Sequence, residues 1–226
     1  MANPVALSVM RADVRSRADI ETSEHVSDTD IDRWINNGIA DVHKKLMKSD
    51  PDFFTVEVEI TPTSASDYDL EDDFLSIRGV WYGAMTDPIE TRSKIYRFHY
   101  QEMGIGPTPG GLCRTRYKVI GQSIRFVPVP QSNRTITVAY VPIPTLLEED
   151  EDTWDSVLGL EEYPVEFACW KARVKAEEDF SGHIMALNEM KDAIGEIAGR
   201  RDVSGAPRIA RVRQAQRRFQ RRGVHF

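Results

Sequence analysis

The sequence has only two cysteines among 226 residues, and Cys113 and Cys169 lie far apart in unlike segments. This excludes a disulfide-stapled scaffold, and we interpret both as free thiols, as in a cytosolic protein. No apolar run approaches the roughly 20 residues that a membrane-spanning helix needs. The N-terminal segment carries arginines but no apolar core of a signal peptide. We therefore expect a protein that is neither exported nor bound to a membrane.

Motifs for catalysis, cofactors and metals are also missing. The glycines of 104–111 are not followed by the Lys-Ser/Thr pair of a phosphate loop. The five histidines have no metal-ligand spacing, and the acidic run Glu148–Asp152 lacks the frame of an EF-hand. Pro51-Asp52 followed by Glu57 and Glu59 resembles a metal-dependent nuclease pattern, but the lysine expected after the second acid is missing. The alternating Glu57 and Glu59 are better explained as the wet face of a strand. We therefore predict that the protein is not an enzyme and binds neither a cofactor nor a metal ion.

The sequence does contain two predicted helices between Leu7 and Met47. Ser27 precedes an apolar run, so its hydroxyl can accept a first-turn amide hydrogen bond, and Asp30 suits a carboxylate variant of the capping box. One apolar stripe at helical spacing follows, formed by Ile31, Trp34, Ile35, Ile39, Val42 and Leu46. The same spacing holds earlier at Leu7, Met10 and Val14. Both helices need partners to cover these faces.

The middle of the chain changes to strand periodicity. Five segments are predicted strands: Phe54–Ile60, Phe74–Tyr82, Tyr117–Ile120, Ser123–Val127 and Thr135–Val141. Gly121-Gln122 is a plausible tight turn, whereas Lys94–Met103 fits a short helix or a strand equally well. The acidic run Glu148–Asp152 is interpreted as a solvated linker back to helical sequence.

Two further helices are predicted after residue 160. Pro164 suits a first helical turn, and a stripe of small residues follows at Val165, Ala168, Cys169, Ala172 and Ala176. Asp179 or Ser181 restarts the pattern to about Arg201. We predict an α+β protein: a four-helix bundle (1–50 and 158–202), an inserted antiparallel β module (51–147) and an extended basic C-terminal arm (203–226).

Charge is distributed unevenly. Of 29 basic and 36 acidic residues, nine arginines and one acid lie in 199–226, which leaves 20 basic and 35 acidic residues, a net charge of −15, in 1–198. A solvated terminus, phosphate contacts with nucleic acid, and docking on an acidic groove of a protein are all open for the arm. Apolar residues spaced among the arginines favour the protein partner, and they are Ile209, Val212, Phe219, Val224 and Phe226.

Several segments, spread in order along nearly the whole chain, together resemble the head-to-tail adaptor (connector) proteins of tailed phages. They are Leu7–Asp19, Val26–Ile31 leading to Trp34–Asn36, Asp50–Phe54, Tyr68–Leu70 before Asp73–Phe74, Ile77–Val80, Ile124–Pro128 and Glu161–Tyr163. Their shared order carries more weight than any single segment.

The resemblance implies a structural protein of the virion neck, made in the host cytoplasm and assembled as a ring of typically twelve copies beneath the portal. The bundle would pack side by side, the β module would present a platform to the next tail component (a nozzle or tail-tube protein), and DNA would pass through without sequence-specific binding. The arm would reach the portal protein through Arg208, Arg211, Arg213, Arg217, Arg218, Phe219, Arg221, Arg222 and Phe226. A nucleic-acid-binding module is the alternative, and an enzyme ranks last.

Overall fold

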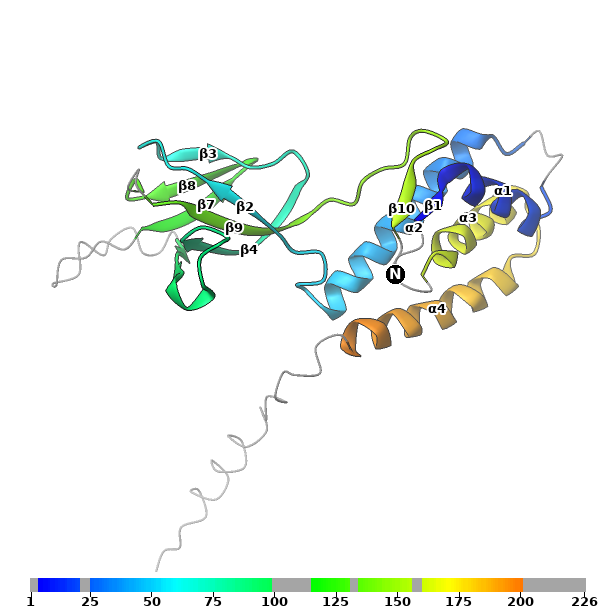
Figure 1. The fold of residues 1–226 in the computed structure, drawn as a ribbon. Helices are drawn as coiled ribbons and strands as arrows, with labels where there is room; N and C mark the ends of the chain where they lie inside the picture. Colours follow the sequence, from blue (N-terminus) through cyan, green and yellow to red (C-terminus); the bar gives the residue numbers. More distant parts are fainter. Residues whose placement is uncertain (1–3, 21–24, 99–114, 131–133, 156–159, 201–226) are drawn as a thin grey trace, which may run out of the picture.

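The computed structural model describes residues 4–20, 25–98, 115–130, 134–155 and 160–200. It is an α+β fold with four helices and several small sheets. Figure 1 shows the helices gathered at one end of the molecule and most strands at the other. The ambiguous segment Lys94–Met103 is described only as far as Phe98, where it contributes two short strands, and 104–111 lies outside the described residues.

The helices come from both ends of the sequence. They are α1 (Leu7–Arg17), α2 (Asp28–Ser49), α3 (Glu162–Lys175) and α4 (Ser181–Arg200). α2 and α3 are in contact with each other, and both also contact α1 and α4. The strands fill the long separation in sequence between α2 and α3, so the helical part is built from two segments that flank the β region.

The predicted start and buried face of α2 are confirmed. Ser27 adopts an extended backbone, and its hydroxyl accepts a hydrogen bond from the Asp30 amide at 3.2 Å. The Asp30 carboxylate reaches back to accept a hydrogen bond from the Ser27 hydroxyl at 3.0 Å, whereas a capping box uses the backbone amide of the N-cap residue. All six residues of the predicted apolar stripe are buried, as are Gly38 and His43, which the pattern did not include. The stripe divides between two apolar clusters, one with α1 and α3 and one with α4.

The small-residue stripe of α3 lets that helix approach its neighbours closely. Val165, Ala168, Cys169 and Ala172 are buried between α1 and α2. Ala176, the last residue of the predicted stripe, lies just past the end of α3 and is only half-buried. The closest approach lies at Gly38, where a Cβ atom would sit 2.7 Å from the Cα of Pro164. Only a glycine at this position allows the two helices to pack at this distance, because carbon atoms normally stay about 3.5–4.0 Å apart.

The β region contains two four-stranded sheets. One has the order β2-β9-β4-β5, built from Val56–Ile60, Ile136–Pro142, Phe74–Tyr82 and Ser93–Lys94. The other has the order β3-β8-β7-β6, built from Asp67–Asp69, Ser123–Val127, Arg116–Ile120 and Tyr96–Arg97. A single apolar cluster contains side chains of both sheets, among them Val80, Phe126 and Val138. The central strand β9 is buried over nearly its whole length.

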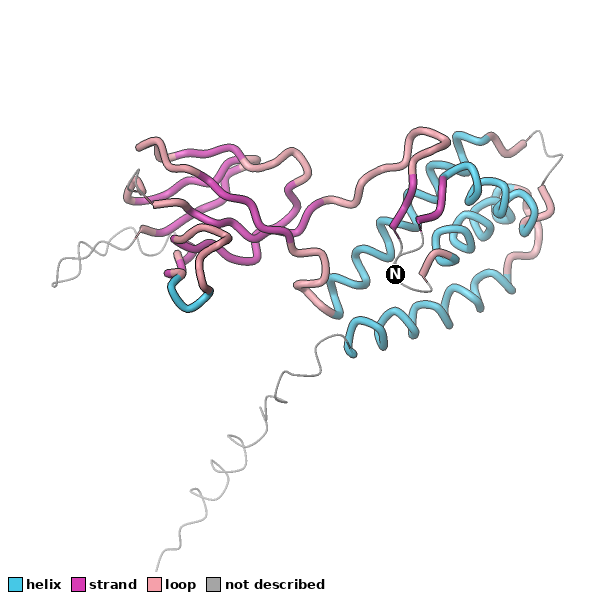
Figure 2. The backbone as a smooth tube through the Cα atoms, viewed as in Figure 1, coloured by secondary structure: helices cyan, strands magenta, loops and turns pink. Residues whose placement is uncertain are grey.

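All five predicted strands are present, and the structure adds elements that the sequence pattern did not reveal. The β7–β8 hairpin turns at Gly121, whose φ of +61° favours glycine. Short strands β3, β5 and β6 extend the sheets, a 3₁₀ turn (η1) covers Ile89–Thr91, and β6 pairs with β7 in parallel rather than antiparallel fashion. A further antiparallel pair, β1 (Pro4–Ala6) with β10 (Thr153–Asp155), lies against the helices, as the tube in Figure 2 shows.

Candidate functional site

The residues predicted to bind a partner lie outside the described structure. The nine arm positions from Arg208 to Phe226 all follow α4, which ends at Arg200. The described residues therefore define the body that carries the arm. Its chemistry is built in four places: the segment returning from the β region, a polar cluster between α2 and α3, a group of possible metal ligands between α3 and α4, and a hollow in the β region.

The segment that returns from β9 to the helices is tied down first by a side-chain amide of α2. The Asn36 amide nitrogen donates to the Leu147 carbonyl at 2.9 Å, and the Asn36 oxygen accepts from the Leu147 amide at 2.9 Å. Leu147 itself is buried in the apolar cluster of α1, α2 and α3. One side chain thus satisfies both backbone groups of a buried residue at the point where the chain re-enters the helical part.

The acidic run after Leu147 caps a helix, which its interpretation as a solvated linker did not include. α1 begins without a side-chain cap. Instead, the Leu7 amide donates to the Asp152 carbonyl at 2.9 Å, and the Ser8 amide donates to the Asp150 carbonyl at 3.2 Å. Arg11 pairs with the Asp150 carboxylate at 2.9 Å. The run is exposed as predicted except at half-buried Asp152, but its carbonyls satisfy orphan amides at the positive end of the α1 dipole.

A polar cluster joins α2 to α3. The Tyr163 hydroxyl donates to Asp41 Oδ2 at 2.6 Å, and it accepts from Lys45 Nζ at 3.1 Å, while Lys45 also pairs with Asp41. Burial raises the pKa of Asp41, but hydrogen bonds from Lys45 and Tyr163 outweigh burial and leave that pKa below its ordinary value. Burial, together with the Asp41 carboxylate, raises the pKa of Tyr163 well above its usual range. Each of the three side chains bonds to the other two, so the cluster holds α3 in place against α2.

Three possible metal ligands meet between α3 and α4. Glu166, Cys169 and His183 place one ligand atom each within 4.8 Å of the other two, and within the described residues they form the one such group. His183 Nδ1 lies 2.8 Å from Glu166 Oε2. Cys169 is a buried free thiol, as predicted, and burial raises its pKa to about 12.

Sequence reasoning missed this group because His183 is separated from the other two by a helix end. The signal that could have found it is the i, i+3 spacing of Glu166 and Cys169, which places both on one face of a helix. The absence of a metal site was a prediction from ligand spacing along the chain, and spatial proximity across two helices does not register in that spacing.

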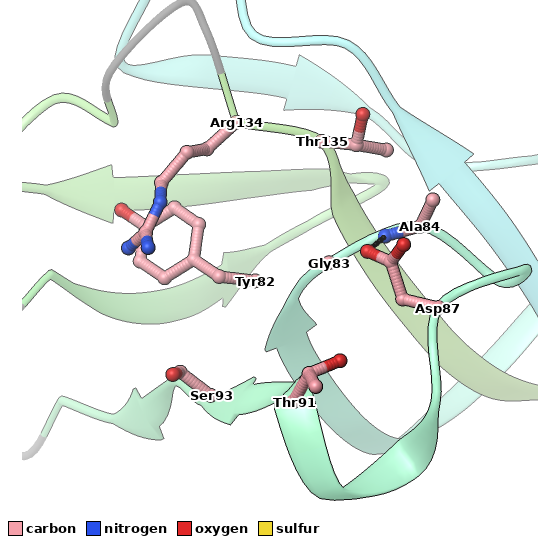
Figure 3. A pocket seen from close by; sticks show the side chains of 8 residues that line it. All are labelled: Tyr82, Gly83, Ala84, Asp87, Thr91, Ser93, Arg134 and Thr135. Carbon is pink, nitrogen blue, oxygen red and sulfur yellow. Dashed lines mark hydrogen bonds between the residues drawn. The ribbon is translucent and has the colours of Figure 1, made fainter.

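A polar hollow of about 350 Å³ lies at the end of β4. Figure 3 shows the side chains that line it. The Arg134 guanidinium lies over the ring of Tyr82, with its carbon 5.5 Å from the ring centroid. The Asp87 carboxylate accepts a hydrogen bond from the Ala84 amide at 2.8 Å. The hollow is lined by Tyr82, Gly83, Ala84, Asp87, Thr91, Ser93, Arg134 and Thr135. Its one carboxylate is engaged with backbone, and no nucleophile lies beside a base among these lining residues.

The two glutamates considered for a nuclease serve the sheet instead. Glu57 Oε2 pairs with Arg92 Nη1 at 3.1 Å, and Glu59 accepts a hydrogen bond from the Met85 amide. Both side chains therefore brace the connection between β4 and β5. Their location on the outer face of β2 agrees with the predicted wet face of a strand.

None of the helices in the described part of the chain combines the length and apolar composition that crossing a membrane requires. A search of curated proteins finds no match to this sequence. The family model described as SU10 adaptor protein matches residues 6–222, which include all four helices and both large sheets. A helical body with a sheet-rich insert, whose polar groups are engaged in holding elements together, agrees with a structural role. The chain belongs to the SU10 adaptor protein family, a family of phage head-to-tail adaptors.

Proposed function

We propose that this adaptor assembles as a ring of twelve copies beneath the portal of a phage capsid. The ring joins the portal to the next tail component, a nozzle or tail-tube protein, and surrounds the channel through which DNA passes. The observation that carries the proposal is the family match over residues 6–222, because it spans the helices, the β region and nearly all of the arm.

The parts of the chain divide this work. Residues 1–50 and 158–202 act as the helical bundle and pack beside their counterparts in neighbouring copies. Exposed apolar side chains on the helices support such packing, with Met185 68% exposed and Val9 52% exposed. Residues 51–147 act as the inserted domain and face the distal tail component, for which exposed Tyr96 and Ile120 offer apolar contact.

The arm, residues 203–226, fastens the ring to an acidic groove of the portal. The family match ends at residue 222, so eight of the nine arm positions named above fall inside it and only Phe226 lies outside. Arginine suits bidentate pairing with carboxylates, and Phe219 adds an apolar anchor among the arginines. A segment that orders on docking pays its ordering entropy once, at assembly.

The acidic body suits a DNA channel that must not hold its cargo. Residues 1–198 carry 20 basic and 35 acidic residues, so like-charge repulsion limits DNA sticking to the ring. Replacing lumen carboxylates by amides is expected to increase DNA retention on the assembled ring. Unchanged retention would contradict this part of the proposal.

Electron microscopy of negatively stained samples tests the assembly. The chain alone and the chain mixed with portal are imaged side by side, and rings stacked on portal are the expected result. A mixture that contains only separate portal particles and single chains would overturn the ring.

Deletion of residues 203–226 tests the arm by co-sedimentation with portal at physiological salt. We expect binding to be lost, with circular dichroism confirming that the helices remain. A matched variant, in which the arm arginines become lysines, keeps the charge and loses bidentate pairing, so intermediate binding is expected. Intact binding by the deletion would make the arm assignment wrong. Tight, salt-sensitive binding of the isolated chain to duplex DNA would instead support a nucleic-acid-binding module.

A further inference from the structure

The start of α4 meets the middle of α3 through a carboxylate, a thiol and an imidazole, although apolar side chains would be enough to pack two helices. His183 lies in the first turn of α4, and Glu166 and Cys169 lie one turn apart on α3. Their side chains differ in exposure: Cys169 is fully buried, whereas the Glu166 and His183 side chains are 14% and 18% exposed. The group therefore has a closed side in the helical core and an open side toward solvent.

An imidazole–carboxylate pair explains two of the three residues but not the third. The hydrogen bond found for the Cys169 thiol is a long contact of 3.9 Å with the Val14 carbonyl. The thiol sulfur nevertheless lies within 4.8 Å of both the glutamate oxygen and the histidine nitrogen. A sulfur, a nitrogen and an oxygen ligand atom thus lie near one another where α3 and α4 meet.

We propose that Glu166, Cys169 and His183 bind a single Zn²⁺ ion that links α3 to α4. Tetrahedral zinc with bonds of about 2.0–2.3 Å places its ligand atoms about 3.3–3.6 Å apart. To reach this geometry, the 2.8 Å contact between His183 and Glu166 opens by roughly half an ångström, and the distances from Cys169 Sγ to these two ligand atoms, which are within 4.8 Å, close by up to about 1.2 Å. Water fills the fourth position on the exposed side.

The ligand types select the metal. A thiolate and an imidazole favour Zn²⁺ and disfavour Mg²⁺ and Ca²⁺, which prefer oxygen ligands only. Zinc binding displaces the Cys169 thiol proton to solvent, and the resulting thiolate and the Glu166 carboxylate together carry two negative charges, which neutralise the divalent ion in a mostly buried place. The metal fixes the beginning of α4, the helix from which the arm continues. This inference concerns the body alone and does not depend on ring formation.

Cobalt titration of the full-length chain, freed of metal with a chelator, tests the proposal. Binding of one Co²⁺ per chain is expected to produce thiolate-to-cobalt charge-transfer absorption and the strong visible bands of tetrahedral cobalt. Added Zn²⁺ is expected to remove both signals. Absence of the charge-transfer absorption would overturn the proposal.

Variants locate the ion. Cys169→Ser is expected to abolish the charge-transfer absorption, and His183→Gln to weaken Co²⁺ binding more than about 100-fold, because even outer-sphere changes cost about 10- to 100-fold. Cys113→Ser and His25→Gln are the matched controls and are expected to bind like the natural chain. Circular dichroism checks that each variant folds. If Cys169→Ser does not fold, Co²⁺ binding by His183→Gln, which changes a partly exposed side chain, is the deciding measurement. Unchanged binding by His183→Gln would overturn the site.

Discussion

Gly38 is the position where packing and helix propensity make opposite predictions. It lies in the middle of α2, where alanine is favoured over glycine by about 1 kcal/mol. An added Cβ, however, would lie 2.7 Å from Pro164 Cα and 3.2 Å from Phe167 Cβ. Both neighbours belong to α3, and the closer one is backbone, so no rotamer change relieves the clash.

The packing cost of an alanine at position 38 is larger than its gain in helix propensity over most of the expected range. Inserting one methyl group into a tightly packed contact costs about 1–3 kcal/mol, and helix propensity returns about 1 kcal/mol. Gly38→Ala is therefore expected to lower the free energy of unfolding by up to about 2 kcal/mol, or several degrees in Tm. Gly195 in α4 has no atom within 4 Å of its added Cβ, so Gly195→Ala is expected to stabilise by about 0.5–1 kcal/mol.

Urea titration followed by helix ellipticity measures both variants on the same protein. The expected result is a lower midpoint for Gly38→Ala and a higher midpoint for Gly195→Ala, with unchanged slopes. Equal stabilisation by the two substitutions would contradict this prediction, because α3 would then give way at no cost. A changed slope for Gly38→Ala alone would also contradict a purely local clash.

Two further predictions concern the connections of the β region. Asn36→Ala leaves both backbone groups of Leu147 without a partner and is expected to lower the free energy of unfolding by about 1–3 kcal/mol in urea titrations. The control, Asn37→Ala, changes an exposed side chain and is expected to shift stability by less than about 0.5 kcal/mol. Equal effects of the two substitutions would contradict the role given to Asn36. Burial lowers the pKa of His43, whose ring stacks on Phe54 at 4.2 Å, below its ordinary value of 6.5. Its stabilising contribution is therefore present above that ordinary value and lost as pH falls through the folded-state pKa, so His43→Phe is expected to flatten stability against pH in that window.

Elements with local periodicity could be predicted from the sequence. The face of α2 repeats every three or four residues, and β8 alternates, so each pattern reports its own burial. The pair β1 and β10 could not be predicted in this way. Each strand has three residues, too few for a period, and their partners lie about 150 positions apart along the chain.

In the candidate sites, too, local features could be predicted from the sequence, whereas features that depend on long-range contacts could not. The composition of Glu148–Asp152 correctly indicates exposure, but the use of its carbonyls to cap α1 depends on where the β region returns the chain. The zinc ligands are another case, because the sequence shows the i, i+3 pair and only the turn between α3 and α4 adds His183. The arm predictions stay predictions, since their residues lie outside the described structure.

The two connections of the β region explain how a sheet-rich insert can transmit position to a helical body. The outgoing connection packs Phe53 and Phe54 into the apolar cluster of α2, α3 and α4, and Asp52 pairs with Arg78 of β4 at 3.2 Å. The returning connection is held by Asn36 and by the cap on α1. An insert tethered by free loops would change its orientation without cost, whereas here reorientation breaks apolar contacts on the outgoing side and partly buried hydrogen bonds on the returning side. A doubly anchored connection of this kind suits the structural role of a head-to-tail adaptor.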